Sequence, residues 1–119
     1  MGPVQVARVY DVDPGDPGVR ILVDRLWPRG IRKDDPRITH WCPDVAPSTE
    51  LRTWYGHRPE VYDAFARRYR AELDSEGGRS ALAQVRELAG DGPVVLLTAT
   101  RDVEHSQATV LADVLADLP

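Results

Sequence analysis

The sequence predicts a compact α/β domain with a mixed, mostly parallel sheet flanked by helices. Two β-rich segments stand near the start, at residues 4–10 and 19–24, and helical patterns fill residues 48–89. Residues 93–99 (PVVLLTA) are a continuous apolar run, which is typical of a central strand covered on both faces. A final helix is expected at residues 102–118. Because helices separate the second strand from the apolar run, a right-handed parallel crossover can join them.

The first strand, residues 4–10 (VQVARVY), leads into the turn-rich loop DVDPGDPG. The second strand, residues 19–24 (VRILVD), is expected to be buried over most of its length. An alternative is that these two strands pair as a hairpin with a long loop. Proline and glycine then interrupt the chain in RLWPRG, and residues 38–42 form a segment too short to assign.

Capping residues mark the expected helices. Ser48 is the predicted N-cap of a short helix that ends at Gly56. Pro59 suits the first position of a second helix, which Gly77 is expected to stop. A third helix is predicted at residues 81–89. The second helix has one apolar face, formed by Tyr62, Phe65, Tyr69 and Leu73.

Length and composition indicate a single domain over residues 1–119. Hydrophobic residues make up 42% and charged residues 29%, which argues against disorder. The single cysteine excludes an intrachain disulfide. No signal-like apolar run opens the sequence, and no stretch approaches the roughly 20 apolar residues of a membrane span. We therefore expect a cytoplasmic protein without a membrane partner.

Basic residues are almost all arginine, since Lys33 is the only lysine beside 14 arginines. The formal net charge of −4 disfavours a general nucleic-acid binder. However, six cations fall between residues 20 and 37, so a local basic patch keeps nucleic acid as an alternative partner. Guanidinium groups also bind carboxylates and phosphates in bidentate fashion. The arginines therefore favour a small anionic ligand.

Polar residues follow two of the predicted strands at the point where each strand ends. In open α/β sheets, ligands bind beyond the carboxyl ends of parallel strands. Arg25 and Arg29 follow the second strand, and Arg101 follows the apolar run just before the last helix. We expect these arginines to converge near a helix N-terminus, which also attracts anions. Trp27 lies in the same loop and is expected to face the ligand. The alternative is that the arginines pair with acidic groups and Trp27 anchors the core.

Two histidines are candidate catalytic residues. His57 lies at a helix–helix junction, and His105 lies near the start of the last helix, where it can point to the expected site. The three histidines of the chain lack CxxC or HExxH spacing, so no metal site is predicted. Cys42 has no neighbouring features that would activate a thiolate. No cofactor is predicted, because GxGxxG, P-loop and GxSxG motifs are missing.

Several motifs resemble those of the YeaO-like family, which is part of domain of unknown function 488. These are RVYD, LVDRLWPRG, APSTELR, WYGH, RYRAEL and the closing LLTATRDVEHSQATVLADVL. The resemblance implies a compact α/β fold in the bacterial or archaeal cytoplasm and no accepted reaction. It places motif residues at Arg25, Trp27, Arg29, Arg52, Trp54, His57 and His105. The segment WCPD departs from the family pattern, in which a basic residue is common near the proline.

Three functions remain open from the sequence. The first is an enzyme or binding protein for a nucleotide, phosphate ester or carboxylate. Arg25, Arg29 and Arg101 would then hold charge with help from Arg52, and a histidine would move protons. The second is a nucleic-acid-associated protein whose tryptophans stack on bases. The third is an interaction module without chemistry, whose tryptophans are core or interface anchors. The sequence does not indicate an oligomeric state.

Overall fold

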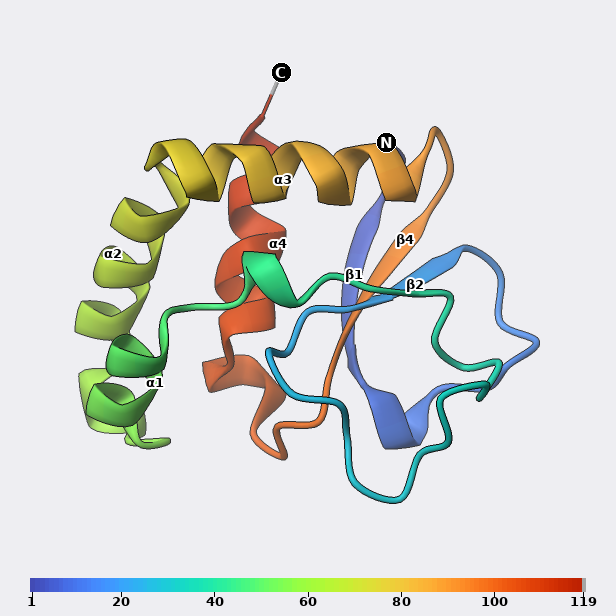
Figure 1. Ribbon diagram of the computed structural model, residues 1–119, viewed down its shortest axis with the longest axis horizontal. Helices are drawn as coiled ribbons and strands as arrows, with labels where there is room; N and C mark the ends of the chain where they lie inside the picture. The colour runs from blue at the N-terminus through green and yellow to red at the C-terminus, as the bar shows by residue number, and fades with distance from the viewer. Residues whose placement is uncertain (119) are drawn as a thin grey trace.

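The computed structural model describes residues 1–118, and within them four strands form one sheet (Figure 1). The strands are β1 (Val4–Arg8), β2 (Val19–Leu22), β3 (His40–Trp41) and β4 (Val94–Thr98), in the order β1-β4-β2-β3. Every pairing between them is parallel. The α/β class is confirmed, and the apolar run forms β4, one of the two inner strands of the sheet.

The alternative of a hairpin between the first two strands is wrong, because β4 lies between them. Val94 of β4 is the register partner of both Val4 and Val19. An all-apolar strand is stabilised in this position, since both of its edges are hydrogen-bonded. Gly18 allows the close approach of β2 to β4: its φ is 98°, and a Cβ there would lie 2.9 Å from the carbonyl oxygen of Pro93.

Residues 1–118 contain four α-helices. The helices α1 (Thr49–Tyr55), α2 (Tyr62–Leu73) and α3 (Glu76–Ala89) lie between β3 and β4, and α4 (Gln107–Asp117) follows β4. The hydroxyl of Ser48 accepts a hydrogen bond from the backbone N–H of Leu51, and Gly56 ends α1 in the left-handed conformation, as predicted. None of the helices within residues 1–118 has the length and hydropathy of a membrane span.

Several helix boundaries differ from the prediction. Pro59 starts a 3-10 turn over Pro59–Val61 and not α2, and α3 starts at Glu76 and not at residue 81. Gly77 does not stop α2, which ends at Leu73, but lies in the first turn of α3. Ser75 explains the difference, because its hydroxyl accepts the backbone N–H of Gly78 and starts a new helix. Near the C-terminus, a 3-10 turn over Val103–His105 precedes α4, which therefore starts later than residue 102.

The helices pack on one face of the sheet, and loops cover the other. Ile21 and Leu96 belong to the main core, together with residues of all four helices. Leu22 and Leu97, which point to the opposite face, belong to a second cluster with Trp27 and other loop residues. Figure 1 shows the long connection from β2 to β3 running apart from the helices. The molecule thus has two main layers, and the long connection carries part of the pocket described next.

Candidate functional site

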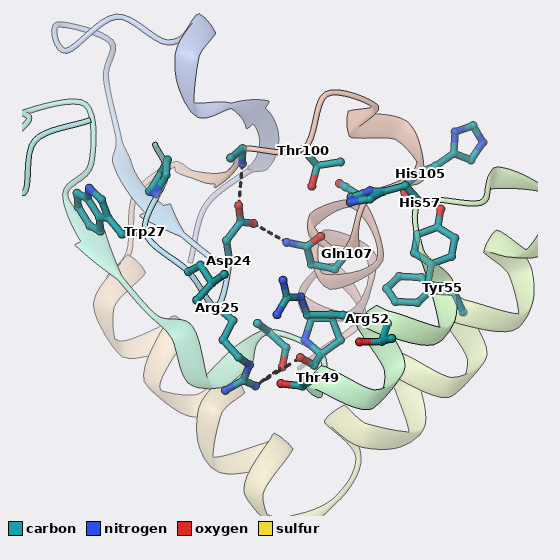
Figure 2. A pocket seen from close by; sticks show the side chains of 18 of the residues that line it. Asp24, Arg25, Trp27, Thr49, Arg52, Tyr55, His57, Thr100, His105 and Gln107 are labelled. Carbon is teal, nitrogen blue, oxygen red and sulfur yellow. Dashed lines mark hydrogen bonds between the residues drawn. The ribbon is translucent and has the colours of Figure 1, made fainter. Parts of the chain in front are cut away.

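A pocket of about 640 Å³ opens beyond the carboxyl ends of β2 and β4 (Figure 2). Its walls come from four parts of the chain: residues 24–29, residues 46–57, residues 99–100 and residues 105–107. Tyr10 and Phe65 complete the lining. The location agrees with the general position of ligand sites in parallel α/β sheets.

Asp24 joins the two strand ends that meet at the pocket. One carboxylate oxygen accepts the backbone N–H of Ala99 at 2.8 Å, and the other accepts the side-chain amide of Gln107 at 2.5 Å. Figure 2 shows two hydrogen bonds leaving the Asp24 carboxylate, one of them to Gln107 at the start of α4. The carboxylate therefore positions the pocket wall. Sequence analysis did not find this role, because the partners are 75 and 83 residues away.

Arg25 lines the pocket but turns its terminal group toward the backbone of residues 46–47. Its Nη2 donates to the carbonyl oxygens of Ala46 at 3.2 Å and Pro47 at 3.4 Å. The Nε of the same guanidinium is buried and has no hydrogen-bond partner within residues 1–118. A buried donor without an acceptor costs roughly 1–3 kcal/mol. Arg25 is thus held in place while one donor stays unsatisfied.

Arg52 and Arg29 add two further guanidinium groups to the lining. Figure 2 shows the Arg52 side chain reaching from α1 into the pocket, toward the Asp24–Gln107 pair. Arg29 lies exposed at the other end, where its carbonyl oxygen accepts the hydroxyl of Tyr10 at 2.8 Å. The pocket therefore gathers three of the four arginines that the sequence analysis proposed as ligand-binding residues.

Arg101, the fourth arginine, is not brought to the pocket. Thr100 lines the pocket instead, and Arg101 is exposed. The backbone N–H of Thr100 donates to the hydroxyl of Thr98 at 3.1 Å, which fixes the turn after β4. The expected meeting of Arg25, Arg29 and Arg101 is not found, because this turn directs the threonine inward and leaves the next residue in solvent.

Trp27 both lines the pocket and anchors the loop. Its Nε1 donates to the carbonyl oxygen of Ile31 at 2.7 Å, and its ring packs edge-on against Trp41 with centroids 5.4 Å apart. The ring is half-buried in the second hydrophobic cluster. Trp27 therefore anchors its loop in the second hydrophobic cluster and also lines the pocket, and contact of its ring with a ligand stays a prediction.

The two candidate catalytic histidines both line the pocket. His57 follows Gly56 and is itself left-handed, with φ of 56°, and its side chain is exposed. The Nδ1 of His105 lies 2.8 Å from a carboxylate oxygen of Asp102. The hydroxyl of Tyr55 donates to the carbonyl oxygen of His105 at 2.7 Å, and burial raises the pKa of Tyr55 to about 12. Tyr55 was missed because its position depends on the approach of α1 to the last loop.

Cys42 is buried away from the pocket, with its thiol 3.5 Å from the amide oxygen of Gln84. Burial raises the pKa of this thiol, which makes it a poor nucleophile. Over the part of the chain that the structure describes, no three His, Cys, Asp or Glu side chains group in a way that could hold a metal ion.

Most cations between residues 20 and 37 are engaged within the fold. Arg20 is 8% exposed and donates to five backbone carbonyl groups of the two neighbouring loops. Arg32 pairs with Asp34 at 3.2 Å, and Arg37 pairs with Asp35 at 2.7 Å. Two of the six cations are thus paired with carboxylates, and Arg20 is buried among carbonyl groups, which leaves fewer of them free to contact phosphates.

A family model described as the inactive DUF488-N3 subclade matches residues 3–118. The chain belongs to this family. It is 58% identical over 113 residues to the uncharacterized protein Rv3073c of Mycobacterium tuberculosis, covering 94% of this chain and 92% of the relative. It is 41% identical over 118 residues to the uncharacterized protein YeaO of Escherichia coli, covering 97% and 98% of the two chains. No solved structure gives a significant match.

The resemblance to the YeaO-like family is thereby confirmed. The names of these relatives specify no reaction or ligand, so a function has to be argued from the pocket. The family model describes the DUF488-N3 subclade as inactive, and this description concerns catalysis and not ligand binding.

Proposed function

We propose that this DUF488-N3 domain binds a small anionic molecule, such as a nucleotide, phosphate ester or carboxylate, in the pocket beyond β2 and β4. The guanidinium groups that line the pocket carry the proposal. Arg52 reaches into the pocket, and the buried Nε of Arg25 lacks an acceptor among the described residues. A guanidinium presents five N–H donors in a planar fork that fits carboxylate and phosphate oxygens.

The charge of the lining supports an anion. Three arginines line the pocket against one carboxylate, Asp24, and that carboxylate already accepts two hydrogen bonds. The first turn of α4 adds partial positive charge to the pocket lining. Ser106 makes no side-chain capping bond, and its hydroxyl donates to the carbonyl oxygen of Val103 instead. The backbone N–H groups at the start of α4 are therefore not capped by Ser106, and the helix end carries partial positive charge.

We further propose that binding takes place without a reaction. The subclade carries the description inactive. The described residues that line the pocket include no cysteine, lysine or glutamate. The buried phenol of Tyr55 donates a hydrogen bond to a carbonyl oxygen, and burial raises its pKa to about 12, which makes it a poorer proton donor than an ordinary tyrosine. These groups bind and orient a ligand better than they attack one.

The experiment is a thermal-shift and calorimetric screen with pyrophosphate, citrate and adenosine monophosphate, with adenosine as the uncharged control. A ligand that binds only the folded chain raises its melting temperature. Arg52→Gln should weaken anion binding about 10-fold or more, since a hydrogen bond to a charged group contributes roughly 1.5–3 kcal/mol.

The matched control is Arg101→Gln, which removes an exposed arginine outside the pocket and should leave affinity unchanged. The proposal is refuted if none of the anions binds, or if adenosine binds as tightly as its monophosphate. Equal losses in both arginine variants would show that net charge alone, and not the pocket, attracts the anion.

A second candidate function is general-base catalysis, which one contact favours. If Asp102 accepts the Nδ1 proton of His105, the Nε2 of that ring is left as an acceptor. His57 lines the same pocket and would be the second proton carrier. Turnover of p-nitrophenyl phosphate or p-nitrophenyl acetate that disappears in His105→Asn would favour catalysis. Anion binding without turnover of either compound would favour the binding protein.

A further inference from the structure

The single lysine of the chain lies against two tryptophan rings. The Nζ of Lys33 is 4.4 Å from the ring centroid of Trp27 and 4.5 Å from that of Trp41. The two ring planes meet at 74°, so they form two walls of a corner. Both distances are within the roughly 6 Å over which a cation is attracted to an aromatic face.

Hydrogen bonds hold both rings in place. The Nε1 of Trp27 donates to the carbonyl oxygen of Ile31, and the Nε1 of Trp41 donates to the carbonyl oxygen of Asp24 at 2.8 Å. Both rings are half-buried and pack with the second hydrophobic cluster. The corner is therefore built by the fold, and its shape does not depend on Lys33.

Lys33 is held in this corner by weaker interactions than the rings are. Its side chain is exposed, and its neighbours Arg32 and Asp34 pair with each other. Within residues 1–118, the ammonium group has no carboxylate partner at salt-bridge distance. The lysine can thus leave the rings without breaking a described hydrogen bond or ion pair.

We propose that Trp27 and Trp41 form a cage for a quaternary or methylated ammonium group, and that Lys33 occupies the cage when no such ligand is present. A methylated ammonium is less hydrated than a primary one, so it enters an aromatic corner at a smaller desolvation cost. Aromatic cages are the usual protein sites for such cations. The tethered Lys33 lowers the apparent affinity by the fraction of time that it fills the cage.

The test uses choline as the probe and nuclear magnetic resonance of the three indole N–H groups as the readout. The matched neutral probe is 3,3-dimethylbutanol, which has the same shape without the charge. Trp54 is an internal control, because its ring contacts the guanidinium groups of Arg58 and Arg68 and lies outside the cage. Choline contains no anionic group, so this test does not depend on the anion-binding proposal.

In Lys33→Ala and Lys33→Gln, millimolar choline should shift the indole signals of Trp27 and Trp41 and leave that of Trp54 in place. The wild type should bind choline about 10-fold more weakly, and Lys33→Arg should behave like the wild type because it keeps a tethered cation. Adding Trp41→Leu to Lys33→Ala should abolish the shifts.

Three results would overturn the proposal. The first is no saturable shift in either uncharged variant while both remain folded by circular dichroism. The second is an equal response to 3,3-dimethylbutanol, which would show an apolar site without cation selectivity. The third is equal choline affinity in the wild type and in Lys33→Ala, which would mean that Lys33 does not compete for the rings.

Discussion

Two neighbouring glycines at the corner between α2 and α3 give opposite predictions for the same substitution. A Cβ on Gly78 would lie 2.2 Å from the carbonyl oxygen of Glu72 and 2.5 Å from the Cα of Leu73. A Cβ on Gly77 would meet nothing within 4 Å. Both residues lie in the first turn of α3. The two alanine substitutions therefore differ mainly in the atoms that the new methyl group contacts.

The magnitudes follow from these contacts. Gly77→Ala should stabilise the protein by up to about 1 kcal/mol, because alanine loses less backbone entropy in a helix. Gly78→Ala gains the same amount, but overpacking against backbone costs about 1–3 kcal/mol. Opening the corner also breaks the cap from the Ser75 hydroxyl to the Gly78 N–H, which contributes about 1 kcal/mol. The net expectation for Gly78→Ala is a loss of about 1–3 kcal/mol.

Urea unfolding followed by far-ultraviolet circular dichroism measures both variants. With a slope of about 2 kcal/mol per molar urea, Gly78→Ala should lower the unfolding midpoint by roughly 0.5–1.5 M, and Gly77→Ala should raise it slightly. A Gly78→Ala variant as stable as the wild type would refute the packing argument. Equal destabilisation by both substitutions would show that the close contact of residue 78 with Glu72 and Leu73 is not the reason for the loss of stability.

Three further predictions concern charged and phenolic groups. Arg20→Leu should destabilise the protein by about 3 kcal/mol in the same urea assay, because five carbonyl groups lose their hydrogen-bond donor. As a control, Arg32→Leu should change the stability by less than about 0.5 kcal/mol, because the ion pair of Arg32 is exposed. Hydrogen bonds from the side chain and the backbone N–H of Arg37 lower the pKa of Asp35 to about 2, so its carboxyl carbon should titrate there by nuclear magnetic resonance. In Arg37→Ala it should titrate at a higher pH, because the side-chain hydrogen bond is lost and only the backbone one remains. The corresponding stability is present above the unfolded pKa and is lost as pH falls toward 2. Burial raises the pKa of Tyr55 to about 12, so an ultraviolet titration of the wild type should show a phenolate step near pH 12 that is missing in Tyr55→Phe. The contribution of the protonated Tyr55 to stability is complete below pH 10 and is lost as pH rises toward 12. An unchanged Asp35 titration in Arg37→Ala, or a Tyr55 step near pH 10, would contradict these assignments.

Local sequence patterns were enough to predict the strand β4 and the ends of α1, because these features depend on residues that are close together in the chain. The apolar run PVVLLTA predicted the central strand, because only a strand covered on both faces tolerates such a pattern. Ser48 and Gly56 predicted the ends of α1, because capping is decided within one turn of helix. The rule for strand ends predicted that Arg25, Arg29 and Arg101 converge, and the first two do line one pocket, since the rule needs only strand direction.

The arrangement of side chains around that pocket was decided by tertiary structure. Whether Arg101 points inward depends on one turn after β4, and whether Arg20 is available to a ligand depends on how two loops fold over it. Asp24 meets Ala99 and Gln107 only after β4 has taken its place beside β2. Hydrogen bonds and ring contacts form at distances of a few ångströms between residues that are far apart in sequence. Their partners are therefore set by strand order, register and loop packing, which no local pattern encodes.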